Sequence, residues 1–321
     1  MPRERFDKPK ESSASPGVYV DLQTLIKMQF EIRGFSLLPK QPVQSLLTGK
    51  HRSKLRGRGL DFEEVRAYEH GDDIRNIDWK VTARVRKPHT KVYTEERERP
   101  VFIIVDQSAS MFFGSSKQMK SVSAVQTAAL AAWKVLTVGD RVGGIVFNDV
   151  EHTETKPNRD RRAVQRFLQM MVEKNTALSA KSYQNQNTGM LSAVLQKTAK
   201  LVTHDYLLLV VSDFAGFDAQ TMKTLISLSR HNDVILFMIS DPMESTLPDG
   251  DMVISDGEFQ LSLKSGDQTY RDKFREAYIK KMDDIRSQTK SYNISFIEIS
   301  TGSPVSSQIR KLLNSGKGRN K

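Results

Sequence analysis

The stretch VFIIVDQSASMFFGSS, at residues 101–116, begins with five apolar residues and continues into a polar loop. Five consecutive apolar residues predict a strand that is buried on both faces, as in a parallel sheet covered by helices. Asp106 follows this strand directly, and Ser108 and Ser110 follow at alternate positions. Because the carboxyl ends of parallel strands form the binding crevice of such a sheet, this loop is the first candidate site.

The chain downstream repeats the pattern of apolar strand and amphipathic helix. Apolar residues recur every three or four positions over 117–137, which predicts a helix. LLLVVS at 207–212 and VILFMIS at 234–240 predict two more buried strands, and Asp213 follows the first of them. The expected fold class is therefore α/β, with a doubly wound, mostly parallel sheet preceded by a small strand-rich subdomain.

Composition divides the chain into four predicted regions. They are a disordered N-terminus at 1–16, a basic, strand-rich region at 17–100, an α/β domain at 101–313 and a basic tail at 314–321. The chain contains no cysteine, which excludes disulfides, zinc–thiolate sites and thiol catalysis. No apolar run is long enough to span a bilayer, and the N-terminus lacks the apolar core of a secretory signal, so we expect a cytoplasmic protein.

The net charge of +11 is concentrated in one segment and in the C-terminal tail. No acidic residue occurs between Glu31 and Asp61, whereas the same segment contains Arg33, Lys40, Lys50, Arg52, Lys54, Arg56 and Arg58. Such a segment can be a solvated basic face, a docking surface for an acidic protein, or a contact for nucleic acid or anionic lipid. Few aromatic residues stand between these charges, which argues against single-stranded nucleic acid as the partner.

The polar residues at the strand ends predict a metal site. Carboxylate and hydroxyl oxygens suit Mg²⁺ or Mn²⁺, and a site with few carboxylates leaves the ion electrophilic, so that it seeks a further anionic oxygen. The candidate ligands are Asp106, Ser108, Ser110, Thr188 and Asp213. Thr176 is the alternative threonine. A structural alternative is that Asp106 caps the next helix and the serines satisfy loop amides.

A second polar cluster lies in RAYEHGDDIRNIDWK, at 66–80. It contains His70, Asp72, Asp73 and Asp78. The main interpretation is a turn with capping aspartates, followed by a packed tryptophan. A metal cluster and an ion-paired surface for a partner are the alternatives.

Two sets of motifs resemble known families. VFIIVDQSASM, GDRVGGIVF (139–147), NTGMLSAV (187–194) and LLLVVSDF (207–214) resemble a von Willebrand factor A (vWA) domain with its metal-ion-dependent adhesion site. Residues 51–100 resemble the signature of the bacterial domain-of-unknown-function 58 family. The resemblance implies that Asp106, Ser108, Ser110, Thr188 and Asp213 take the adhesion-site positions. It also implies a MoxR-type AAA+ ATPase as partner.

The expected function is a non-enzymatic, metal-dependent adaptor that binds an acidic group on a client protein. The chain is not the motor, because Gly49-Lys50 has Gln44 and His51 where a phosphate-binding loop needs glycine and a hydroxyl residue. One alternative is a metal-dependent hydrolase or phosphotransferase with Asp106 as nucleophile, although Ser108 stands where a second carboxylate is expected. Another is nucleic-acid binding through residues 33–58.

Overall fold

The computed structural model describes residues 17–32, 50–51, 60–96, 99–179, 182, 186–246, 251–255, 260–264 and 268–314. The chain divides into a small unit within 40–99 and a large unit formed by the residues before and after it. The predicted disordered region 1–16, the basic segment 33–58 apart from residues 50–51, and the tail from 315 lie outside the described residues.

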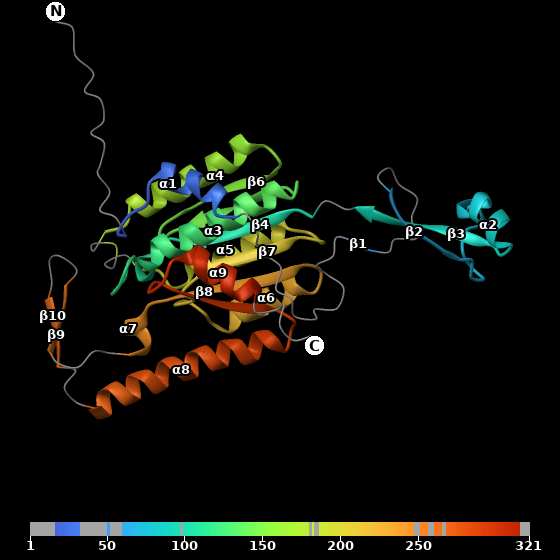
Figure 1. Ribbon diagram of the computed structural model, residues 1–321. Helices are drawn as coiled ribbons and strands as arrows, with labels where there is room; N and C mark the ends of the chain where they lie inside the picture. Colours follow the sequence, from blue (N-terminus) through green and yellow to red (C-terminus); the bar gives the residue numbers. More distant parts are fainter. Residues whose placement is uncertain are drawn as a thin grey trace, which may run out of the picture. The chain divides into compact units, whose positions relative to one another are not determined.

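A six-stranded sheet forms the centre of the large unit, in the order β11-β8-β7-β4-β5-β6 (Figure 1). Its strands are β4 (Val101–Asp106), β5 (Val142–Phe147), β6 (His152–Asn158), β7 (Leu207–Ser212), β8 (Asp233–Ser240) and β11 (Ser295–Ser300). All neighbours pair in parallel except β6, which runs antiparallel to β5. The predicted α/β fold with a mostly parallel, doubly wound sheet is confirmed.

Helices cover both faces of this sheet (Figure 1). One face is covered by α1 (Leu22–Lys27), α3 (Lys120–Thr137), α4 (Arg161–Thr176) and α9 (Val305–Asn314), and the other by α5 (Met190–Leu201), α6 (Ala219–Ser229) and α8 (Gln268–Lys290). Ile103 of β4 packs into the first layer and Ile104 into the second. Alternate residues of a strand point to opposite faces, so a strand between two helical layers has to be apolar throughout.

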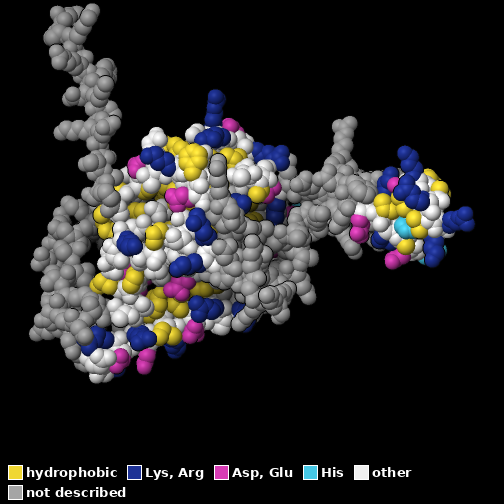
Figure 2. Space-filling view, viewed as in Figure 1, with side chains coloured by type: hydrophobic (Ala, Val, Ile, Leu, Met, Phe, Trp, Pro, Cys, Tyr) yellow, Lys and Arg dark blue, Asp and Glu magenta, His cyan; other side chains and the backbone are white. Residues whose placement is uncertain are grey.

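Short elements complete the large unit. They are the 3₁₀ turns η1 (Met28–Phe30) and η3 (Ala109–Met111), helix α7 (Pro242–Ser245), and the antiparallel pair β9 (Asp251–Ser255) and β10 (Gln260–Lys264). None of the described helices is both long and apolar enough to cross a membrane. Figure 2 shows Lys and Arg side chains dispersed among Asp and Glu over the visible face of the large unit.

Residues 17–32, which we grouped with the N-terminal region by composition, pack onto the α/β domain instead. Leu25 is fully buried in the core cluster that contains α3. Its carbonyl oxygen accepts a hydrogen bond of 2.9 Å from Nε1 of Trp133, in α3. The amphipathic segment therefore buries its apolar side against the large unit, and only residues 40–99 form the separate unit.

The small unit contains a three-stranded antiparallel sheet in the order β1-β3-β2, made of β1 (Lys50–His51), β3 (His89–Glu96) and β2 (Leu60–Ala67). Between β2 and β3 lie the 3₁₀ turn η2 (Ile74–Asn76) and helix α2 (Trp79–Val85). The region is strand-rich, as predicted. Helix α2 was not predicted from the sequence.

The aspartates of the 66–80 cluster stabilise these turns. Asp73 accepts a hydrogen bond from the Arg75 amide at the start of η2, and Asp78 caps α2 through the amides of Lys80 and Val81. Within the described residues, no three His, Cys, Asp or Glu side chains form a group that could hold a metal. The prediction that aspartates cap these turns is confirmed. The prediction that the tryptophan packs is wrong, because Trp79 is 70% exposed.

Candidate metal centre

Asp106 is held at the end of β4 by hydrogen bonds to both of its carboxylate oxygens. Oδ1 accepts from the Ser108 amide at 2.8 Å, and Oδ2 accepts from the Ser212 hydroxyl at 2.5 Å. The side chain is buried. Asp106 does not cap the next long helix, since α3 begins after Met119 without a side-chain cap. The end of β4 therefore holds a buried carboxylate that is bonded both to the loop after β4 and to the last residue of β7.

The two serines of the loop bring their hydroxyls together. After Asp106 the chain turns through η3, and Oγ of Ser108 lies 3.2 Å from Oγ of Ser110. Two adjacent ligands of an octahedral Mg²⁺ ion, each about 2.1 Å from the metal, are separated by about 3 Å. The spacing of the two hydroxyls therefore fits neighbouring positions on such an ion.

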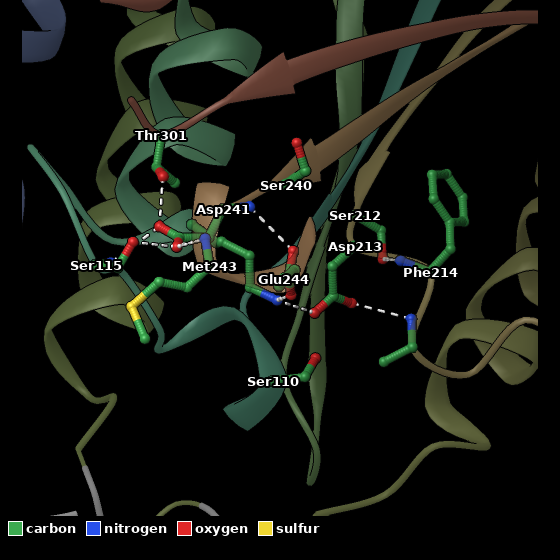
Figure 3. Close-up of polar contacts among 12 residues, drawn as sticks. Ser110, Ser115, Ser212, Asp213, Phe214, Ser240, Asp241, Met243, Glu244 and Thr301 are labelled. Carbon is green, nitrogen blue, oxygen red and sulfur yellow. Dashed lines mark hydrogen bonds and ion pairs between the residues drawn. The ribbon is translucent and has the colours of Figure 1, made fainter. Parts of the chain in front are cut away.

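Asp213 follows β7, the strand that pairs with β4 in the sheet. Its Oδ1 accepts from the Ala215 amide at 3.0 Å, and its Oδ2 accepts from Nζ of Lys120 at 2.8 Å. Figure 3 shows the Ser110 side chain directed towards the Asp213 carboxylate. The chain turns sharply here: Phe214 has a φ of 51°, and its amide donates to the Ser212 hydroxyl. Non-glycine residues in this left-handed conformation are concentrated at functional sites.

Asp149 connects the serine loop to the loop that carries Thr188. Its Oδ2 accepts from the Ala109 amide at 2.6 Å, and its Oδ1 accepts from the Asn187 amide at 2.8 Å. The Thr188 carbonyl oxygen lies so close to Gly216 that an added Cβ would approach within 2.0 Å of it. These contacts place the Thr188 backbone between the loops after β5 and β7, beside the serine loop.

The two candidate threonines differ in their use of the hydroxyl group. Thr176 ends α4, and its hydroxyl donates to the carbonyl oxygens of Val172 and Glu173 in the same helix. Thr188 lies in an exposed turn before α5. The arrangement favours Thr188 over Thr176 as a ligand.

Charge at the strand ends is asymmetric. Burial, together with the nearby carboxylate of Asp213, raises the pKa of Asp106 to about 7. Burial by itself would also raise the pKa of Asp213, but the Lys120 ammonium group, together with hydrogen bonds from the Ala215 amide and the Ser110 hydroxyl, holds this pKa below its usual range. A divalent cation would favour the ionised form of both groups, because it adds opposite charge to a buried carboxylate pair.

The donor set fits a hard cation. It offers two hydroxyls at ligand spacing and two buried carboxylates, and the backbone of Thr188 lies in the neighbouring loop. Mg²⁺ and Mn²⁺ prefer oxygen ligands of this kind and commonly retain water. Ser108 and Ser110 are the candidates for direct contact, with Asp106 and Asp213 supplying the negative charge.

Three residues that contribute to this arrangement were missed in the sequence. Asp149 stands two residues after the apolar strand β5, so the rule that pointed to Asp106 and Asp213 could have identified it. Ser212 could have been noted as the last residue of a buried strand. No pattern in the sequence indicated that Lys120 belongs to the site, because a lysine at the start of an amphipathic helix is ordinarily exposed.

A family model described as "Protein of unknown function DUF58" matches residues 64–287. The chain belongs to this family. The DUF58 match includes β3, all five candidate ligands, Lys120 and Asp149. Among curated proteins, uncharacterised proteins of Mycobacterium bovis and Mycobacterium tuberculosis are each 28% identical over 253 residues, covering 78% of this chain and 78% of theirs.

Solved structures similar to this DUF58 chain include vWA-type domains. BatB from Bacteroides thetaiotaomicron is 11% identical, with a TM-score of 0.43 and coverage of 68% of this chain and 98% of its own. The SpRpn10 VWA domain is 13% identical, with a TM-score of 0.35 and coverage of 70% and 100%. A von Willebrand factor type A protein from Catenulispora acidiphila is 12% identical, with a TM-score of 0.36 and coverage of 70% and 43%.

Proposed function

We propose that this DUF58 protein is a non-enzymatic binding module that uses Mg²⁺ or Mn²⁺ to bind an acidic group on a protein partner. Ser108 and Ser110 hold the ion, with Thr188 beside them, and Asp106 and Asp213 compensate its charge. The observation that carries this proposal is the 3.2 Å separation of the two serine hydroxyls beside two buried carboxylates. A site with mainly neutral ligands leaves the ion able to take one further carboxylate oxygen.

The arrangement around Asp106 supports binding rather than catalysis. A nucleophilic aspartate needs a free oxygen directed at its substrate and an acid or base close by. Both oxygens of Asp106 accept hydrogen bonds from the protein, and Ser108 stands where the second carboxylate would be needed. We therefore expect no turnover of phosphoester substrates above the rate in buffer.

As the partner we propose a MoxR-type AAA+ ATPase, in an assembly or maturation process resembling that of a chaperone. This partner is implied by the family resemblance of the motifs at 51–100 and 101–214. In the proposed complex the ATPase supplies the motor activity that this chain lacks, and the DUF58 protein presents the ion to a carboxylate of the ATPase or of its client.

Calorimetric titration of Mn²⁺ and Mg²⁺ into the full chain tests the ion site. Wild type should release or absorb heat, and Asp106→Ala should not, while both unfold at similar temperatures in EDTA. Equal heats for the two proteins would overturn the assignment. Capture of a MoxR-type ATPase from the same organism should then depend on Mg²⁺ and fail both in EDTA and with Ser110→Ala. Capture that is insensitive to both would point to another contact surface.

A further inference from the structure

Lys120, the first residue of α3, is a buried lysine beside the candidate ion site. It is only 3% exposed. Its Nζ donates to Oδ2 of Asp213 at 2.8 Å and to Oε1 of Glu244 at 2.6 Å. A buried ammonium group is tolerated where anionic groups compensate its charge. Lys120 is therefore a fixed positive charge in contact with a carboxylate that we assign to the ion.

Asp213 has limited capacity for a second cation. One of its oxygens faces the Ala215 amide, and the other faces Lys120. Like charges repel strongly in a buried environment, where little water screens them. A divalent ion that draws on Asp213 has to displace the ammonium group or bind against its repulsion.

Glu244 offers the lysine a second anionic partner. It lies after β8, the strand next to β7, and its Oε2 accepts from the Asp241 amide at 2.9 Å in the capping box of α7. Figure 3 shows Glu244, in α7, and Asp213, directly after β7, with their carboxylates directed towards the same space. Because Glu244 is fixed by the helix cap and already bonded to Lys120, it can hold the ammonium group when Asp213 is released.

We propose that Lys120 is an internal counter-ion that competes with the divalent cation for Asp213, and that Glu244 is the positioning residue that retains Lys120 when the ion is bound. This inference rests on the proposed function. The affinity for the ion is then set by a competition between a tethered cation and a free one. The ion site is weaker than its oxygen ligands alone would make it.

Mn²⁺ titration of the full chain tests the competition through changes in opposite directions. Lys120→Met should bind Mn²⁺ more tightly, by roughly 10- to 100-fold, the range in which residues around a metal's ligands act. Glu244→Gln should bind it more weakly, because Lys120 then depends on Asp213 alone. In the double variant, Glu244→Gln should lose most of its effect, since Glu244 acts through the lysine. Lys174→Met is the matched control: Lys174 is also buried and ion-paired, with Glu151, and its removal should leave Mn²⁺ affinity unchanged.

The outcomes separate this inference from the proposed function. Wild-type binding with equal or weaker binding by Lys120→Met would overturn the competition and leave the ion site in place. If neither wild type nor any variant, including Lys120→Met, binds Mn²⁺ in a way that depends on Asp106, the proposed function itself is overturned. If Lys120→Met does not fold, Glu244→Gln decides alone, and Mn²⁺ binding as tight as in wild type rejects the inference.

Discussion

The carboxylate of Asp149 accepts a hydrogen bond of 2.6 Å from the backbone amide of Ala109, in the serine loop. Its other oxygen accepts from the Asn187 amide, so one side chain holds together the loops that carry the serines and Thr188. The candidate ligands come from segments far apart in the sequence, and the spacing between them depends on hydrogen bonds of this kind between the loops. Supporting contacts of this kind commonly decide how well a metal site binds.

Asp149→Asn should weaken Mn²⁺ binding by roughly 10- to 100-fold. The amide nitrogen of asparagine would face a backbone N–H donor, so one of the two hydrogen bonds to the amides of Ala109 and Asn187 is lost. Asp160→Asn is the matched control, because Asp160 also accepts from a backbone amide, at the start of α4, and is exposed. Calorimetry on both variants checks the prediction, and equal losses in the two would contradict it.

The two threonines can be separated by the same substitution. Thr188→Val should reduce Mn²⁺ affinity by about tenfold or more, because a hydroxyl beside the ion is replaced by a methyl group. Thr176→Val should leave the affinity unchanged, since the hydroxyl of Thr176 is bonded within α4. A Mn²⁺ titration that finds the loss only in Thr176→Val would reverse the assignment.

Asp241 predicts a dependence of stability on pH. Burial by itself would raise its pKa, but hydrogen bonds from Ser115 and Thr301 outweigh burial and hold the pKa below the ordinary value of 3.8. The Asp241 carboxylate therefore binds a proton less readily in the native state than in the unfolded state. The stability it contributes is fully present above pH 3.8 and is lost as the pH falls through the native pKa.

Asp241→Asn should thus cost most stability near neutral pH and less as the pH falls below 3.8. Urea unfolding of wild type and variant between acidic and neutral pH measures the difference. Figure 3 shows the hydrogen bonds that the substitution disturbs, to Ser115, Met243 and Thr301. A difference that does not change with pH would show that the charge of Asp241 is not what these donors stabilise.

The two tryptophans should respond differently to a polar quencher. Trp79 is 70% exposed, whereas Trp133 is 3% exposed and donates its Nε1 hydrogen to Leu25. Iodide should therefore quench the fluorescence of Trp133→Phe strongly and that of Trp79→Phe weakly. Similar quenching of both variants in the full chain would contradict the exposure of Trp79.

The sequence by itself determined the α/β class and the edge of the sheet where the polar residues lie. A strand buried between two helical layers has to be apolar throughout, so VFIIV and LLLVV were recognisable without a structure. Parallel neighbours end at the same edge, which is why Asp106 and Asp213 could be assigned to one site. Each inference depends on a local pattern combined with a general rule of topology.

Only the tertiary structure decided the contacts that no local pattern reports. The polar strand β6 contains Pro157 and was missed, because an edge strand needs neither a fully apolar sequence nor every backbone hydrogen bond. Helix α2 depends on a cap at Asp78, and Trp79 was expected to pack but remains exposed. Lys120 is buried only because β7 and β8, distant from it in the chain, bring two carboxylates to its ammonium group. A charge becomes tolerable inside a protein through partners that folding supplies, and those partners cannot be identified from the residues beside it.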